Sequence, residues 1–186
     1  MINPSVSRDK LVAPRLSTLE TLQLRKGEIL VKTRPHTVCG GALDAKMYFP
    51  KGRSQVWESL TDYPCWSRYF PDVTQSRVIE DKRDAKLGRR LYQAAEKSFL
   101  FINAQVNVYL RVFELEQQHI RFQFEKGSFS DFTADLTLSD FEKGTLLQYS
   151  VSATPLIPVP SFFVEQAMKM DLPVNLRNMR REICRN

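Results

Sequence analysis

Histidines and carboxylates are the side chains here that could transfer protons, but their spacing matches no catalytic pattern. The two histidines, His36 and His119, lie far apart. His36 follows a proline in an expected loop, and His119 follows a turn, where a surface histidine is the simpler interpretation. The sequence contains no GxSxG, HExxH, P-loop or GxGxxG motif. We therefore assign no catalytic residue, and the sequence favours a binding protein over an enzyme.

Cysteine spacing gives equally little support for a metal or a disulfide framework. Cys39, Cys65 and Cys184 are odd in number and far apart, with no CxxC pair. This favours a reducing compartment such as the cytoplasm, and we expect neither a metal nor another cofactor. No apolar run reaches the roughly 18 residues that a membrane span needs. Charged residues also interrupt the N-terminal region early, which argues against a secretory signal.

The formal net charge of +6 is concentrated at the two ends of the chain. Residues 1–27 and 169–186 each carry five basic and two acidic side chains, whereas residues 28–168 are neutral overall. Such ends suit attraction to an anionic surface, although they also suit a solvated surface that keeps the protein soluble. Nucleic-acid binding is disfavoured because the aromatic residues are scattered and the middle is neutral. Peripheral contact with a membrane remains as an alternative.

The first 27 residues read as an N-terminal arm with one short helix. Ser17 and Glu20 form a capping-box pattern, and Gly27 is a natural stop. Leu16, Leu19 and Leu22 fall on one side, so the helix is expected to pack on the domain. Residues 28–186 are expected to form that single domain.

The domain begins with strands, changes to helical spacing, and then returns to strands. Strands are expected at 28–34 and 42–49, and short helices at 54–60 and 64–70. Alternation of apolar and polar residues then predicts six more strands, at 73–81, 87–98, 101–115, 118–126, 131–141 and 144–153. Because the links are turn-length, the strands should form an antiparallel meander with one covered face.

The last segment, 161–184, has helical periodicity. Its apolar stripe comprises Val164, Met168, Leu172, Leu176, Met179 and Ile183. Pro173 interrupts the stripe and is expected to bend the helix. The covered face of the sheet is the only large partner for this stripe. We therefore predict an α+β fold in which a curved antiparallel sheet surrounds a long C-terminal helix, with either a filled core or an apolar cavity between them.

Several short motifs in this order carry a resemblance to a known family. They are Met47–Pro50, Val56–Tyr63, Trp66–Pro71, Phe113–Leu115, Gly144–Tyr149 and the proline-flanked entry to the last helix. From about Ala42 to Ile183, three quarters of the chain, the sequence resembles the START-like superfamily. Within it, the polyketide cyclase/dehydrase and coenzyme Q-binding group is the most similar. The resemblance implies the helix-grip (START/Bet v 1-like) fold and an internal cavity for a lipid, sterol, polyketide or quinone.

The resemblance also identifies candidate cavity residues. They are Trp57, Tyr63, Trp66, Tyr69, Phe70, Val108, Leu110, Phe122, Phe124, Leu136, Tyr149, Val164, Met168 and Leu172. The aromatic residues on the two short helices could instead form a satellite core, which we favour for Trp57, whereas Tyr69 and Phe70 suit a cavity rim.

The proline-rich loop before the last helix is the candidate cavity mouth. Three prolines stiffen it, yet it carries apolar side chains, a combination that suits membrane contact, partner contact or a lip over the cavity. The candidate residues are Phe129, Leu156, Ile157, Val159, Phe162 and Phe163. Three functions follow: binding or transport of a hydrophobic ligand (a lipid, quinone or other isoprenoid), an enzyme of the cyclase/aromatase type, or a protein-interaction module.

Overall fold

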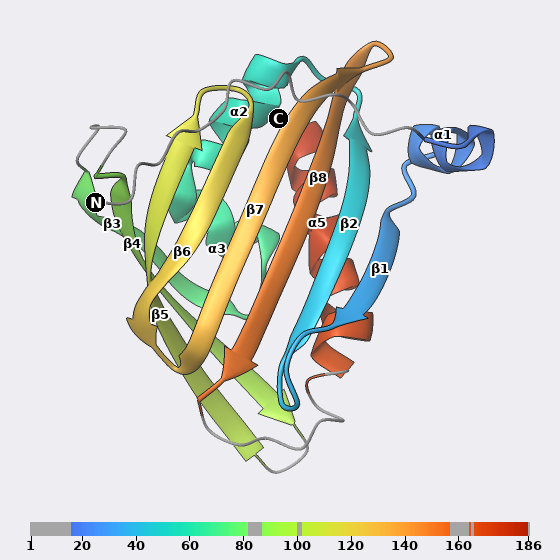
Figure 1. The fold of residues 1–186 in the computed structure, drawn as a ribbon. Coiled ribbons are helices and arrows are strands. Elements are labelled where there is room, and N and C mark those ends of the chain that lie inside the picture. Colours follow the sequence, from blue (N-terminus) through green and yellow to red (C-terminus); the bar gives the residue numbers. More distant parts are fainter. Residues whose placement is uncertain (1–15, 82–86, 100–101, 157–163, 165, 186) are drawn as a thin grey trace, which may run out of the picture.

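The computed structural model describes residues 16–81, 87–99, 102–156, 164 and 166–185 (Figure 1). Its helices are α1 (Thr18–Arg25), α2 (Arg53–Thr61), the 3-10 turn η1 (Tyr63–Cys65), α3 (Trp66–Tyr69), the π-helical turn η2 (Ala167–Asp171) and α5 (Leu172–Arg185). Its strands are β1 (Leu30–Pro35), β2 (Gly41–Phe49), β3 (Val73–Asp81), β4 (Arg89–Phe99), β5 (Ile102–Leu115), β6 (His119–Gly127), β7 (Phe129–Phe141) and β8 (Gly144–Pro155).

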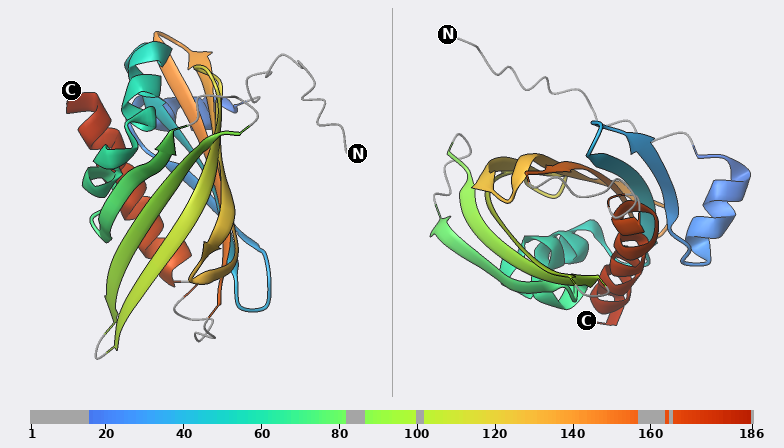
Figure 2. Two further views of the ribbon diagram at one scale, coloured as in Figure 1. Left: turned by 90° about the vertical axis from the view of Figure 1, so that its left-hand side faces the viewer. Right: turned by 90° about the horizontal axis from the view of Figure 1, so that it is seen from below.

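The eight strands form one antiparallel sheet in the order β1-β2-β8-β7-β6-β5-β4-β3. Strands β3 to β8 are the predicted meander, and β1–β2 adds to its far edge because β2 pairs with β8 along its whole length. The sheet curves around α2, α3 and α5, which all lie on its concave side (Figure 2). The predicted helix-grip architecture is therefore confirmed.

Two sharp turns of the meander use residues in the left-handed region of backbone space. Gln117 (φ 55°) turns the chain between β5 and β6, and Glu142 (φ 53°) does so between β7 and β8. Gly127 (φ 142°) ends β6, where a Cβ atom would lie 2.3 Å from the Asn107 carbonyl oxygen. Only glycine fits so close to the neighbouring strand, so this turn depends on its missing side chain.

The C-terminal helix meets the sheet through the second half of the predicted stripe. Leu176, Met179 and Ile183 are fully buried, as the helical spacing predicts. Ahead of α5, the chain forms the π-helical turn η2. Pro173, which has no N–H to donate, is the second residue of α5 and so lies in its first turn, where a proline is tolerated.

Helix α1 confirms the capping box but corrects the predicted packing. Ser17 Oγ accepts from the Glu20 amide, and Glu20 Oε2 accepts from the Ser17 amide. Leu24, however, is the helix residue buried against Tyr48 and Leu146 on the convex side of the sheet, whereas Leu19 and Leu22 are exposed. The prediction that Leu19 and Leu22 pack on the domain is wrong, because the helix meets the sheet through Leu24 and through Glu20, whose Oε1 accepts from Lys46 Nζ of β2 at 3.1 Å.

The convex face carries ion pairs that make stability depend on acid. Burial by itself would raise the pKa of Asp135, but hydrogen bonds from His119 and Arg121, with the charge of Arg121, together lower it below its ordinary 3.8. A carboxylate with a lowered pKa stabilises the fold above its unfolded pKa, and that contribution is lost as pH falls through the folded value. We expect the free energy of unfolding in urea to decrease as the pH falls below about 4. The decrease should be smaller for Asp135→Asn than for the wild type. Equal acid sensitivity of both proteins would contradict this assignment.

Candidate functional site

The concave face of the sheet is densely filled at the end that α2, η1 and α3 cover. The Trp66 ring stacks on Phe70 (centroids 5.6 Å apart) and meets Phe122 at 5.0 Å. Trp66 Nε1 donates to the Leu60 carbonyl at 2.9 Å, which fixes the indole orientation. Beneath these rings, residues such as Phe49 and Leu147 have no exposed surface. This end is an ordinary close-packed core.

The opposite end of the concave face is lined by smaller side chains and is less tightly closed. Here β8 presents Val151 and Ala153, beside Ala134 of β7. Val151 and Ala153 face the helix side yet retain 5% and 7% of their surface, and Val108 of β5 retains 7%. Trp66 and Phe70 at the close-packed end keep similar fractions, 6% and 8%, so the two ends differ in the size of their inward side chains.

The helical segment covers this less tightly closed end. Val164, Met168 and Leu172 are half-buried, in contrast to the fully buried second half of the stripe. At Gly41, at the start of β2, a Cβ atom would lie 2.8 Å from Met168 Cγ and 3.2 Å from Val164 Cγ1. The segment that contains Val164 and Met168 therefore lies directly on β2, and the flexible Met168 side chain covers part of this end.

The predicted cavity residues separate into two groups. Trp57, Tyr63, Trp66, Tyr69, Phe70, Leu110, Phe122 and Leu136 belong to the close-packed core, and Tyr69 also borders an outer groove described below. Val108, Phe124, Tyr149, Val164, Met168 and Leu172 lie along the concave face and its helical cover, where side chains keep some exposure. The aromatic residues on the short helices therefore pack mainly as core, including Tyr69 and Phe70, which were predicted to form a rim.

A half-buried polar cluster joins the 3-10 turn η1 to strands β4 and β5. The Tyr63 hydroxyl donates to Glu114 Oε1 at 2.6 Å, and Arg89 Nη1 lies 3.3 Å from the same oxygen. Burial, and then the negative charge of Glu114, raise the pKa of Tyr63. Sequence reasoning missed Arg89 and Glu114, although Glu114 continues the inward alternation of Val112 and Leu110 along β5.

Other charged residues of the sheet lie outside the concave face. Arg90 donates to Glu125 on the convex face, and Asp135 binds His119 and Arg121 there. Glu96 is exposed and accepts from Gln105. Each of these residues alternates with the buried residues of its strand. The period of two therefore already predicts that its side chain points away from the concave face.

Two of the predicted mouth residues are described, and they lie at the less tightly closed end. Phe129 is half-buried against Phe132 with ring centroids 5.6 Å apart. Leu156, directly after β8, is 62% exposed, and its amide donates to the Ser128 carbonyl. Ile157, Val159, Phe162 and Phe163 lie outside the described residues.

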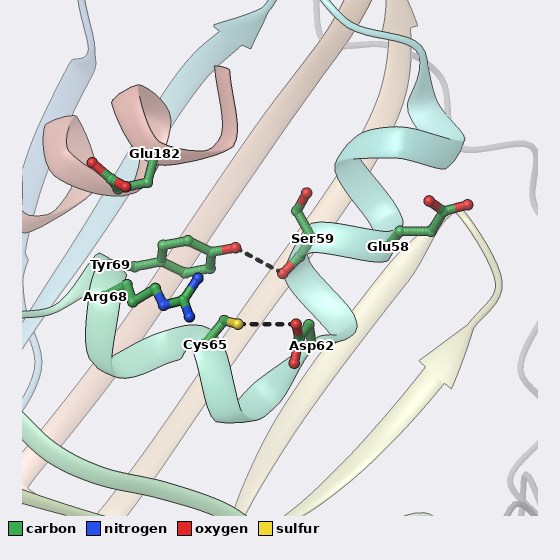
Figure 3. A pocket seen from close by; sticks show the side chains of 7 residues that line it. All are labelled: Glu58, Ser59, Asp62, Cys65, Arg68, Tyr69 and Glu182. Carbon is green, nitrogen blue, oxygen red and sulfur yellow. Dashed lines mark hydrogen bonds between the residues drawn. The ribbon is translucent and has the colours of Figure 1, made fainter. Parts of the chain in front are cut away.

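A separate groove of about 290 Å³ lies on the outer side of the short helices (Figure 3). It is lined by Glu58, Ser59, Asp62, Cys65, Arg68, Tyr69 and Glu182. Cys65 Sγ donates to Asp62 Oδ2 at 2.9 Å, and this bond, with burial, raises the pKa of the thiol. Burial raises the pKa of Tyr69 to about 12, and its hydroxyl donates to the Ser59 carbonyl.

A raised thiol pKa reduces the fraction of reactive thiolate, so Cys65 is a weaker nucleophile than an ordinary cysteine. In the described part of the chain, no group of three or more His, Cys, Asp or Glu residues is arranged to hold a metal ion. No helix among the described residues is long and apolar enough to cross a membrane.

Solved structures with the same fold include proteins of different activities. A START superfamily protein from Mycobacterium smegmatis matches with a TM-score of 0.61 at 14% identity, covering 84% of this chain and 97% of that chain. The Zhui aromatase/cyclase from a Streptomyces species matches with a TM-score of 0.58 at 10% identity, covering 78% and 94%. A STAR-related lipid transfer protein from Xanthomonas axonopodis matches at 0.56 and 13%, covering 82% and 98%. At these identities the likeness shows the fold alone.

The sequence itself gives the family. No curated protein matches the chain. The family model described as polyketide cyclase / dehydrase and lipid transport, however, matches residues 50–180, which run from the β2–α2 junction into α5. That stretch covers well over half of the chain and contains both the close-packed core and the less tightly closed end. The chain therefore belongs to the polyketide cyclase/dehydrase and lipid transport family.

Proposed function

We propose that this protein binds a hydrophobic molecule, such as a lipid, a quinone or another isoprenoid, between the sheet and the segment 164–172. The observation that carries the proposal is the contrast along one concave face. The apolar stripe of α5 is fully buried over the close-packed end, whereas Val164 and Met168, which cover the other end, are only half-buried. An apolar surface that is accessible but faces inward favours an apolar guest.

Binding or transport is favoured over catalysis by the groups that line this face. A cyclase needs an acid or base that can reach its substrate. Among the described residues of the concave face, the carboxylate is that of Glu114, which is engaged by Tyr63 and Arg89. A carboxylate held in this way stabilises the fold and has no free geometry for proton transfer.

A binding panel tests the proposal. Displacement of a neutral fluorescent probe by quinones, fatty acids and carotenoids should give saturable, one-to-one competition for at least one class. The reason is that burying each methylene contributes about 0.8 kcal/mol. Absence of competition by every class, with the protein shown to be folded by its circular dichroism, would refute the proposal.

We further propose that the less tightly closed end rests on a membrane surface while ligand is exchanged. Three exposed apolar side chains gather there: Val38 in the β1–β2 turn, Leu156 after β8 and Met170 in η2. The strand ends are held together by a hydrogen bond between Thr37 Oγ1 and Thr154 Oγ1 at 2.9 Å. Exposed apolar side chains that gather at one end of a protein suit shallow insertion into a lipid surface.

Vesicle binding tests this surface. The double variant Leu156→Asp/Met170→Asp should bind vesicles that contain anionic lipid at least tenfold more weakly than the wild type. Each apolar side chain that inserts into the lipid contributes at most about 1.5–3 kcal/mol to binding, and the double variant loses two of them. Leu19→Asp is the matched control, because Leu19 is similarly exposed but belongs to α1, which packs through Leu24 on Tyr48 and Leu146. Equal binding by wild type and double variant in a sedimentation assay would contradict the proposal.

A further inference from the structure

Tyr149 occupies the middle of the concave face, in strand β8. In the sheet register it lies between Ala45 of β2 and Leu136 of β7. Only 5% of its surface is exposed, and it belongs to the same core cluster as Val151 and Leu147. It therefore stands at the boundary between the close-packed end and the accessible end, with the short Ala45 side chain on one flank.

The Tyr149 hydroxyl has no hydrogen-bond partner in the part of the chain that the structure describes, unlike the polar atoms of the other buried rings on this side. Tyr63 donates to Glu114, Trp66 to the Leu60 carbonyl and Tyr69 to the Ser59 carbonyl. Phenylalanine would pack the same ring here, so what the hydroxyl adds is the capacity to donate a hydrogen bond. The hydroxyl is thus placed for a partner that is not part of the protein.

Its chemistry limits what that partner can be. Burial raises the pKa of Tyr149, so the phenol keeps its proton and acts as a donor. The partner must therefore accept a hydrogen bond. An anionic acceptor would need a nearby cation. The inward-facing arginine of strand β4, Arg89, is already engaged by Glu114. An unpaired carboxylate buried here would pay a large desolvation penalty.

We propose that Tyr149 is the polar anchor of the ligand site and donates a hydrogen bond to a neutral acceptor, such as a carbonyl oxygen, at the inner end of an elongated apolar ligand. This inference rests on the proposed function and makes it more specific. The ligand enters with its carbonyl end toward Tyr149, and its apolar remainder lies along Val151 and Ala153 under Met168.

A cycle of two ligands and two proteins tests the anchor. The ligands are a long-chain methyl ketone and its parent alkane, and the proteins are the wild type and Tyr149→Phe, with affinities measured by displacement of 1-aminoanthracene. We expect Tyr149→Phe to bind the ketone about fivefold to tenfold more weakly, the effect of one neutral hydrogen bond, and to bind the alkane as tightly as the wild type does. Tyr48→Phe is the matched control, because Tyr48 packs with Leu24 and Leu146 on the opposite face.

The outcomes separate the two proposals. If both proteins bind ketone and alkane but the ratio of the two affinities does not change with Tyr149→Phe, the anchor is refuted and the hydrophobic site stands. If neither ligand binds the wild type, and the wider panel also fails, the proposed function itself is refuted. The melting temperature of unliganded Tyr149→Phe should equal or exceed that of the wild type, and a clear decrease would show that the hydroxyl serves the fold instead.

Discussion

Replacing Val151 by tryptophan is expected to reduce ligand affinity at least a hundredfold while leaving the protein folded. Val151 lies on the concave face, retains 5% exposure and faces the segment that contains half-buried Met168. An indole placed there would occupy the space that we assign to the ligand. If the ligand and not a side chain fills that space, as we propose, the free energy of unfolding should change by less than about 1 kcal/mol, well below the usual cost of overpacking.

Leu147→Trp is the matched control for this prediction. Leu147 is on the same strand and the same face, but it is fully buried in the close-packed end. A larger ring there must displace its neighbours, and we expect destabilisation of about 1–3 kcal/mol in urea unfolding. If Val151→Trp were destabilised as strongly as Leu147→Trp and still bound ligand like the wild type, the site would not lie along Val151.

Replacing Trp66 by alanine is expected to cost about 3–5 kcal/mol of unfolding free energy, the usual range for removing a buried large aromatic side chain. Trp66 meets four other rings, those of Tyr63, Tyr69, Phe70 and Phe122. It also links α3 to the end of α2 through the Leu60 carbonyl. A loss of this size approaches the total stability of a small domain. Urea unfolding followed by circular dichroism measures it.

Two variants separate the contributions of this indole. Trp66→Phe retains a ring but loses the bond to Leu60, so it should cost less than Trp66→Ala. Ser67→Ala removes only an exposed hydroxyl that donates to the Pro64 carbonyl, and should change stability by less than about 0.5 kcal/mol. A cost below about 1 kcal/mol for Trp66→Ala would show that the short helices are not anchored by their aromatic residues.

Much of this fold could be predicted from local patterns. The strand alternation placed Ile120 and Phe122 inside and Arg121 outside, and the period of the last helix identified Leu176, Met179 and Ile183 as buried. Both patterns reflect burial of one face, which the sequence records directly. The sequence-based strand boundaries differ from those observed by no more than about two residues, within the usual uncertainty of such boundaries.

What local patterns could not predict depends on distances between segments that are remote in sequence. Nothing near Leu22 indicates that α1 buries Leu24 and not Leu22 against the sheet, because this depends on where β2 and β8 lie. Likewise, the partnership of Tyr63 with Glu114 joins residues 51 positions apart. The period of two indicates that Val108 and Leu110 both face inward, but only the assembled packing separates the accessible Val108 from the filled position of Leu110.

Native mass spectrometry of gently purified protein tests the central claim most directly. The account predicts that the wild type carries a bound hydrophobic molecule, seen as a mass increment that is lost on denaturation, and that Val151→Trp prepared in the same way carries none. A wild type that remains free of any such molecule, both as purified and after incubation with quinones, fatty acids and carotenoids, would contradict it.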